Sequence, residues 1–217
     1  RETDPMTQKY TPTTWRSALL LVASLLLASP VFADHPGENL NQVMAAKEAA
    51  FEPILPGDAP DLAWIGAAHE STSLNALRGK IVVLSFVPEG CGDPCEAQQA
   101  TLTETLTALN SSAMRDMVVF VTLSDEPQSG PATQNRIFAR TPDPEKLSHA
   151  NAALAGVSER KDLTPQVHLL NRAGQQVGIF HGADFEPLNL LLYINGLTNT
   201  HPHAEPSFWQ RMTGWFL

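Results

Sequence analysis

The two cysteines of this sequence, Cys91 and Cys95, are the residues whose type and spacing best suit chemistry. They are the only cysteines in the chain and lie four positions apart. If both belong to one helical turn, this spacing places their Cα atoms about 6 Å apart on one face. That separation permits a disulfide, and two reduced sulfurs could also bind one soft metal ion. The spacing therefore indicates redox chemistry or metal binding.

The flanking residues place the pair between a buried strand and a helix. Residues 81–87 are a short apolar run rich in β-branched residues, which is typical of a buried strand. Residues 96–110 mix Ala, Leu, Gln and Glu, with three leucines at helical spacing. Pro94 suits a first helical turn, where the missing N–H of proline costs nothing. The cysteines are thus expected at a helix start, where free N–H groups and the helix dipole favour a thiolate.

Three acidic residues near the pair, Glu89, Asp93 and Glu96, oppose a thiolate. They limit the expected fall of the thiol pKa unless a metal or a nearby cation compensates. A purely structural disulfide is the alternative, because exported chains commonly contain one. We give it less weight, since so tight a loop restricts little of the unfolded chain.

The first 33 residues predict export. Basic residues precede an apolar run over 18–28, and a small-residue cleavage site ends at Ala33. The run is shorter than the roughly 20 apolar residues of a membrane-spanning helix, and an uncleaved membrane anchor is the alternative. We expect residues 1–5 either to lie upstream of a natural start at Met6 or to be foreign to the natural chain. Cleavage would leave a periplasmic protein.

Composition excludes several classes of function. The chain has a net charge of −9 and no basic run, which argues against nucleic acid or an anionic membrane surface as a partner. It contains no glycine-rich phosphate loop, no serine nucleophile elbow and no paired-carboxylate signature. Hydrolase and nucleotide chemistry therefore receive little weight.

The rest of the chain predicts an α/β fold. Strands are expected over 62–65, 81–87, 117–123, 136–139, 167–170 and 176–180, and helices over 40–51, 96–110, 145–155 and 186–194. The turn at 171–174 joins the last two strands into a hairpin. This order is typical of a thioredoxin-like three-layer fold with a central mixed β-sheet. We expect residues 34–60 to be a lead-in and residues 61–217 to form the domain.

A stripe of aromatic and apolar residues over 206–217 predicts an extra C-terminal helix. Docking on its own domain is the favoured role of this helix. Binding of a partner or of a membrane is the alternative.

The stretch around the cysteines resembles the SCO/SenC copper chaperones of the thioredoxin-like superfamily. The resemblance is carried by Arg78-Gly79-Lys80, by the C-x-x-x-C motif Cys91-Gly92-Asp93-Pro94-Cys95, and by FVTLSDEP over 120–127. It covers roughly residues 60–182. It implies a protein that binds Cu(I) through both cysteines and a distal histidine and serves assembly of the cytochrome oxidase copper centre. Some members of the family are thiol–disulfide reductants.

The sequence departs from this family at the third copper ligand. Asp162-Leu163 stands where the family has Asp-His, so His168 and His181 are the substitutes to consider. His168 is the candidate metal ligand beside Cys91 and Cys95, although a buried core histidine is the alternative. A solvated position at the end of a strand is the expectation for His181.

Thr164-Pro165 resembles the Thr-Pro of thioredoxin-like reductases, in which the proline is cis and faces the cysteines. A cis bond costs little only before proline, so Pro165 is the candidate for this role. His201 and His203 form a His-x-His pair that is expected to be exposed and, without a third ligand, incidental.

Three hypotheses follow from these residues. The first is Cu(I) handling by Cys91 and Cys95, with transfer to an apo copper protein in the same compartment. The second is thiol–disulfide exchange without metal, in which Cys91 attacks a client protein and Cys95 resolves the mixed disulfide. The third is a non-enzymatic exported binding domain with an inert disulfide. The first two are compatible, because one cysteine pair can serve both metal and electrons.

Overall fold

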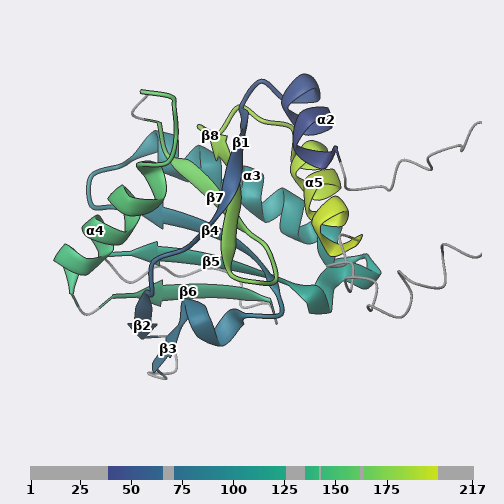
Figure 1. The fold of residues 1–217 in the computed structure, drawn as a ribbon. Coiled ribbons are helices and arrows are strands. Elements are labelled where there is room, and N and C mark those ends of the chain that lie inside the picture. The colour runs from purple at the N-terminus through teal and green to yellow at the C-terminus, as the bar shows by residue number, and fades with distance from the viewer. Residues whose placement is uncertain (1–38, 66–70, 126–134, 142, 162–163, 200–217) are drawn as a thin grey trace, which may run out of the picture. The chain divides into compact units, whose positions relative to one another are not determined.

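An eight-stranded mixed sheet carries helices on both faces (Figure 1). The computed structural model describes residues 39–65, 71–125, 135–141, 143–161 and 164–199. Its strands are β1 (Phe51–Asp58), β2 (Ala63–Ile65), β3 (Ser71–Ser73), β4 (Ile81–Val87), β5 (Val118–Ser124), β6 (Arg136–Arg140), β7 (Gln166–Leu170) and β8 (Gln175–His181). Its helices are α2 (Leu40–Lys47), α3 (Asp93–Asn110), α4 (Pro144–Ala155) and α5 (Pro187–Asn199), with 3-10 turns η1 (Leu74–Leu77) and η2 (Ala113–Met117). The strand order is β1-β8-β7-β4-β5-β6-β2-β3.

Strand β4 lies inside the sheet and supplies side chains to two cores, because successive residues of a strand point to opposite faces. Ile81 and Val83 pack with residues of α2, α3 and α5, whereas Val82, Leu84 and Phe86 pack with residues of α4. β4 pairs in parallel with β5 and antiparallel with β7. The predicted three-layer α/β fold with a central mixed sheet is therefore confirmed.

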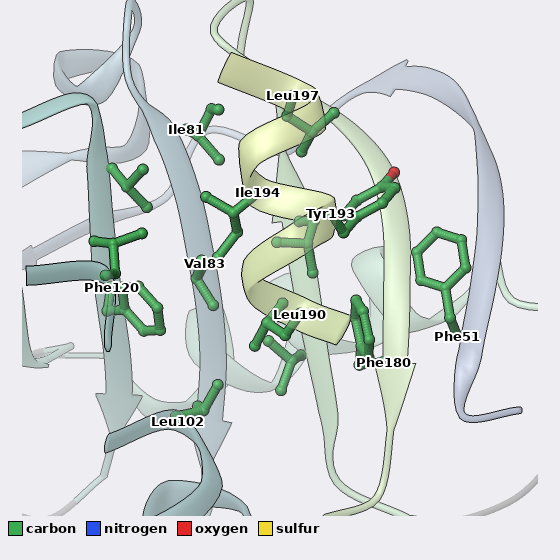
Figure 2. Packing of buried hydrophobic residues seen from close by; sticks show 14 of the residues in the cluster. Phe51, Ile81, Val83, Leu102, Phe120, Phe180, Leu190, Tyr193, Ile194 and Leu197 are labelled. Carbon is green, nitrogen blue, oxygen red and sulfur yellow. The ribbon is translucent and has the colours of Figure 1, made fainter. Parts of the chain in front are cut away.

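Helix α5 closes the first core (Figure 2). Four of its buried residues belong to this core and recur at helical spacing, namely Leu190, Tyr193, Ile194 and Leu197. The Tyr193 ring centroid lies 4.6 Å from that of Phe51, and its hydroxyl donates to Asn41 Oδ1 at 2.7 Å. The predicted helix ended at Ile194, but the observed helix continues because Leu197, one turn later, is still buried.

The predicted helix over 40–51 ends early, at Lys47, and the chain then enters β1. The carboxylate of Glu48 accepts the Ala50 N–H at 3.1 Å and the Asn189 amide at 2.9 Å. Burial raises the pKa of Glu48, but its hydrogen bonds lower it more, so the pKa lies below the usual range. Glu48 thereby fixes the turn between α2 and β1.

Strand β1 was missed by sequence analysis, because two prolines and a glycine within FEPILPGD are typical of a loop. The strand pairs antiparallel with β8 and lies at the edge of the sheet. Prolines are tolerated on an edge strand, and here the register shifts between Pro53 and Gly57. The segment expected to be only a lead-in thus supplies a strand to the sheet.

Within the described residues, no helix combines the length and apolar character needed to cross a membrane. The predicted signal segment over 1–33, the predicted C-terminal helix over 206–217, and His201 and His203 lie outside the described residues.

Candidate functional site

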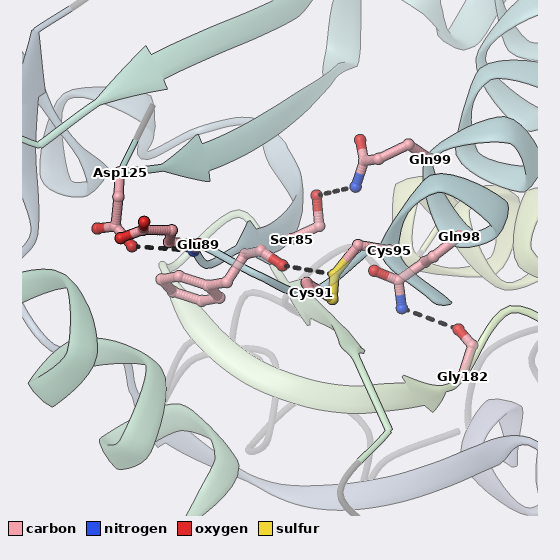
Figure 3. Close-up of a disulfide and its surroundings, with 9 residues drawn as sticks. Ser85, Glu89, Cys91, Cys95, Gln98, Gln99, Asp125 and Gly182 are labelled. Carbon is pink, nitrogen blue, oxygen red and sulfur yellow. Dashed lines mark hydrogen bonds between the residues drawn. A yellow bond between two sulfur atoms is a disulfide. The ribbon is translucent and has the colours of Figure 1, made fainter. Parts of the chain in front are cut away.

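Cys91 and Cys95 form a disulfide between the end of β4 and the start of α3 (Figure 3). Their Cα atoms are 5.8 Å apart, which agrees with the separation expected from the spacing. Helix α3 begins at Asp93, so Cys91 precedes the helix and Cys95 lies in its first turn. The carbonyl of Gly92 accepts the N–H groups of Cys95 at 3.0 Å and of Glu96 at 3.1 Å. Gly92 has a φ of 60°, a conformation that favours glycine at this reversal of the chain.

The two sulfurs differ in accessibility. Cys95 is 2 % exposed, whereas Cys91 is half-buried. Both cysteines line two cavities of about 340 and 440 Å³. The structure therefore presents Cys91 as the sulfur that another molecule can reach.

Pro165 lines the larger of these cavities together with Cys91 and Cys95, as the resemblance implied for its position. Its peptide bond is trans, so the expected cis bond is wrong. The trans isomer is the lower in energy before proline by about 0.5–1 kcal/mol. The Pro165 carbonyl accepts the Gly182 N–H at 2.8 Å, and the Gly182 carbonyl accepts the Gln98 amide at 2.8 Å. Gln98 thus connects the cysteine helix to the opposite wall of the cavity (Figure 3).

A buried polar network lies beneath the smaller cavity and was missed by sequence analysis. Gln99, which lines that cavity, donates from its amide to Ser85 Oγ at 3.1 Å. Its carbonyl oxygen accepts from Thr122 Oγ1 at 3.0 Å and from Arg136 Nη2 at 2.8 Å. The signal that could have revealed this network is the pair Ser85 and Thr122, which interrupt two otherwise apolar strands and are each 1 % exposed.

Acidic residues surround the mouth of the site, as expected from the sequence. Glu89 and Glu96 line the smaller cavity, and both are exposed. Asp125 accepts the Glu89 N–H at 3.3 Å (Figure 3). Water and salt screen exposed charges of this kind.

The structure does not place His168 with the cysteines, so the predicted three-ligand set of Cys91, Cys95 and His168 is wrong. His168 is fully buried, and its Nδ1 lies 3.1 Å from the Gln176 amide nitrogen. Its ring packs edge-on against Phe86 at 5.8 Å between centroids. His168 shares a face of β7 with Gln166, which lines the larger cavity, but it lies two residues further along the strand, where its ring contacts Phe86 and Gln176.

Burial, followed by the charge of His181, lowers the pKa of His168 to about 3. His168 is therefore a neutral core histidine at physiological pH, which was the alternative interpretation. Among the described residues, no group of three or more His, Cys, Asp or Glu side chains is arranged to hold a metal ion.

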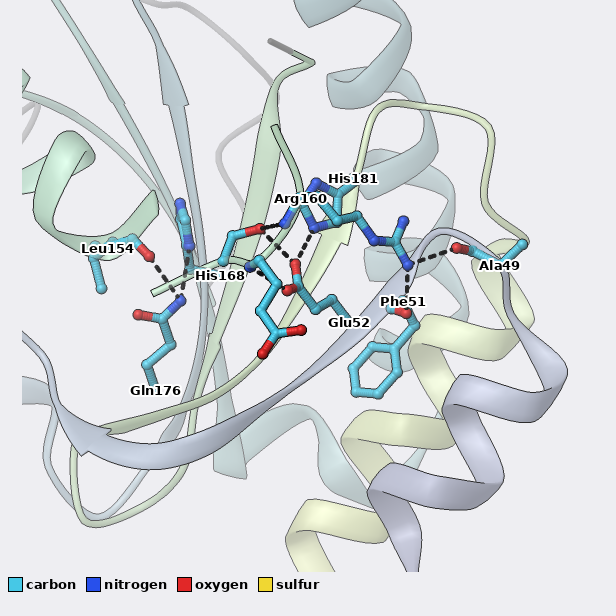
Figure 4. Close-up of polar contacts among 10 residues, drawn as sticks. Ala49, Phe51, Glu52, Leu154, Arg160, His168, Gln176 and His181 are labelled. Atoms are coloured by element: carbon cyan, nitrogen blue, oxygen red, sulfur yellow. Dashed lines mark hydrogen bonds and ion pairs between the residues drawn. The ribbon is translucent and has the colours of Figure 1, made fainter. Parts of the chain in front are cut away.

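The expectation of a solvated His181 is also wrong, because it is 5 % exposed and paired with a carboxylate from another strand. Its Nε2 lies 2.7 Å from Glu52 Oε2 (Figure 4). Glu52 also accepts from Ser158 Oγ at 2.6 Å and from the Glu159 N–H at 2.7 Å. Burial raises the pKa of Glu52, but these three partners lower it more, so the pKa lies below the usual range. The pair joins β8 to β1, the strand that sequence analysis missed.

No family model and no curated protein matches this chain. Solved structures do match it. BsSco, described as a member of the Sco family of cytochrome c oxidase assembly proteins with a disulfide switch, matches at a TM-score of 0.56 and 12% identity. That match covers 68% of this chain and 97% of BsSco.

Two further structures are similar in the same way. A SCO1/SenC family lipoprotein from Bacillus anthracis matches at a TM-score of 0.56 and 14% identity, over 68% of this chain and 98% of that one. Yeast Sco1 with copper bound matches at a TM-score of 0.54 and 16% identity, over 70% of this chain and 98% of that one. At these identities the likeness is one of fold. The described chain therefore has a thioredoxin-like fold similar to that of Sco proteins, with a C-x-x-x-C disulfide at the end of its central strand.

Proposed function

We propose that this chain is an exported thiol–disulfide exchange protein whose reduced cysteine pair also handles Cu(I), in the assembly of a copper centre such as that of cytochrome oxidase. The observation that carries the proposal is the Cys91–Cys95 disulfide, with Cys91 half-buried at two cavities and Cys95 2 % exposed behind it. Support for the assembly role comes from the similar fold of BsSco, whose family is described as assembling cytochrome c oxidase. The clients would be an apo copper protein or another thiol or disulfide protein.

The arrangement supports exchange by two displacement steps. In the reduced protein the Cys91 thiolate attacks a client disulfide, forming a mixed disulfide and releasing one client sulfur as a thiolate. The Cys95 thiolate then attacks Cys91 Sγ, which re-forms the Cys91–Cys95 bond and releases the second client thiolate. Two electrons pass to the client, and the two thiolates that it gains take up protons from solvent.

The local backbone favours the thiolate state. Cys95 lies in the first turn of α3, at the positive end of the helix dipole. The Cys95 sulfur lies 4.0 Å from the Phe86 carbonyl oxygen, which can accept from its thiol only in the reduced state. The pair therefore has the setting of a reactive dithiol.

Exchange is tested by reduction of a small peptide disulfide in the presence of excess dithiothreitol. We expect the chain to accelerate this reduction and the Cys91→Ser/Cys95→Ser double variant to have no effect. Equal rates for the two proteins would refute exchange and support the hypothesis of an inert disulfide.

Cu(I) handling is the second candidate function, favoured by two sulfurs that can converge on one ion. Thiolates are soft ligands that select Cu(I), and the 5.8 Å between the Cα atoms suits a shared ligand position. His168 does not fit as a third ligand, because it is fully buried and lines neither cavity. We therefore propose that the two cysteines hold Cu(I) without His168.

Anaerobic titration with Cu(I) against a competing chelator checks this proposal. We expect the reduced protein to bind one ion per chain and the oxidised protein to bind none. The His168→Leu variant should retain the stoichiometry, because its ring does not reach the sulfurs. Loss of binding in that variant, while it remains folded, would restore His168 as a ligand. Absence of tight binding by the reduced wild type would remove copper from the function.

Export to the periplasm remains part of the proposal and depends on the sequence of residues 1–33. The lipoprotein description of the similar Bacillus anthracis structure is consistent with a location outside the cytoplasm. Such a compartment would allow the disulfide to form and would give access to client proteins there.

A further inference from the structure

Arg136 is a buried cation that hydrogen-bonds to Gln99, a residue of the smaller cavity that both cysteines line. It is 8 % exposed, and none of the ion pairs within the described residues involves it. Its guanidinium donates to neutral oxygens, Gln99 Oε1 at 2.8 Å and Thr103 Oγ1 at 3.1 Å. The Phe138 ring centroid lies 4.7 Å away, and Arg136 Nε has no hydrogen-bond partner in the part of the chain that the structure describes. Burying a guanidinium without a counter-charge is unfavourable, so fold stability does not explain this residue.

Gln99 connects Arg136 to the cysteine pair. It lies four residues after Cys95 on α3, about 6 Å along the helix axis, and lines the cavity that both cysteines line. The guanidinium bonded to Gln99 Oε1 thus lies on the order of 10 Å from the sulfurs, a range at which a unit charge still acts strongly through a protein interior.

Among the described residues, the other charged groups on the segments that flank the pair and Arg136 are in contact with solvent. They are Glu89, Asp93, Glu96, Glu104, Arg115, Asp116 and Asp125, of which Asp125 is partly buried and the rest are exposed. Exposed charges are screened by water and salt, whereas the buried charge of Arg136 is not. Arg136 therefore contributes more to the electrostatic potential at the sulfurs than the number of acidic residues alone indicates.

We propose that Arg136 is a positioning residue that acts through Gln99 and whose charge stabilises the thiolate formed when the Cys91–Cys95 disulfide is reduced. The inference rests on the proposed exchange function, for which it names the cation that offsets the surrounding acidic residues. In the oxidised protein no thiolate is present, and no carboxylate among the described residues forms an ion pair with Arg136. In the reduced protein the thiolate supplies the missing counter-charge.

An Arg136→Met variant distinguishes an electrostatic role of Arg136 from a structural one. In an Arg136→Met variant, Gln99 Oε1 still accepts from Thr122, and Thr103 Oγ1 still donates to the Gln99 carbonyl. Each former partner therefore keeps a hydrogen bond. Replacing an unpaired buried charge by an apolar side chain is commonly neutral or stabilising. If Arg136 had only a structural role, Arg136→Met would instead make the oxidised protein less stable.

The test is the rate at which iodoacetamide alkylates Cys91 in the reduced protein, measured as a function of pH with the modified site identified by mass spectrometry. We expect Arg136→Met to slow alkylation at pH 7 roughly threefold to tenfold and to move the pH profile upward. Arg136→Lys should stay within about twofold of wild type, because it keeps the charge. Arg140→Gln on the same strand removes an exposed cation and should leave the profile unchanged.

Denaturant unfolding of the oxidised proteins completes the test, with Arg136→Met expected to be as stable as wild type or more so. An unchanged alkylation profile in Arg136→Met would overturn the proposal, as would loss of folding, which would make the arginine structural. Alkylation requires neither client nor copper. Its outcome can therefore be distinguished from failure of the peptide-reduction or copper assays.

Discussion

A Cys91→Ser variant is expected to lose reduction of the peptide disulfide by about a hundredfold or more, because the remaining sulfur is buried and cannot reach a client. Cys95 is 2 % exposed, whereas Cys91 is half-buried at both cavities. Only Cys91 can therefore make the first attack. The measurement is the initial rate with dithiothreitol as the reductant.

A Cys95→Ser variant should complete the first attack and then stop, because the second sulfur is missing. We expect it to accumulate a mixed disulfide between Cys91 and the client, visible as a mass increase that a reductant reverses. The double Ser variant is the control and should trap nothing. Trapping by Cys91→Ser in place of Cys95→Ser would reverse the assigned order of the two sulfurs.

The free energy of unfolding is expected to fall by roughly 2–3 kcal/mol between pH 6.5 and pH 4.5 because of His168. Burial lowers the pKa of His168 from 6.5 to about 3 in the folded protein, so only the unfolded chain binds a proton over this range. A group with a depressed folded pKa contributes stability above its unfolded pKa and loses that contribution as pH falls towards the folded pKa. Urea unfolding at closely spaced pH values measures the change.

A His168→Leu variant should be less sensitive to pH over the same range. The Gln176 amide, which loses His168 as a partner, still donates to the Leu154 carbonyl at 3.2 Å. His149 is exposed on α4, so His149→Leu controls for loss of one histidine. If His168→Leu retains the full pH dependence, the loss of stability has another origin.

Below about pH 4.5 a further loss of stability is expected in both wild type and the His168 variant. The hydrogen-bonded carboxylates of Glu48 and Glu52 have pKa values below the usual range, so their contributions disappear as the pH falls through those lower values. Measurements in the two pH ranges therefore distinguish the contribution of His168 to stability from those of Glu48 and Glu52.

The elements nearest the cysteines were predictable because their signals are local. Strand β4 matches the predicted range 81–87, since an uninterrupted apolar run bounded by polar residues has few other interpretations. Helix α3 ends at Asn110 as predicted and begins at Asp93, so Pro94 lies in its first turn, as was also predicted. The disulfide follows from the same local spacing.

The partners of these elements were not predictable, because they depend on register and on the side of the sheet. Whether His168 reaches the cysteines is decided by the register of β7 on β4, in which His168 lies opposite Leu84. The pairing of Glu52 with His181 joins residues that are distant in sequence. The sequence around Arg136 does not indicate that its side chain reaches Gln99 on α3. Each of these features requires the assembled sheet.

The position of β1 at the edge of the sheet has a consequence for any shortened form of the protein. Without β1, the outer backbone groups of β8 from Gln175 to Phe180 would be exposed, and Ser158 and His181 would lose the carboxylate of Glu52. An exposed, apolar edge is a template on which the strand of another molecule can pair. A fragment that begins after Asp58 would therefore tend to self-associate through β8, and soluble monomers require β1.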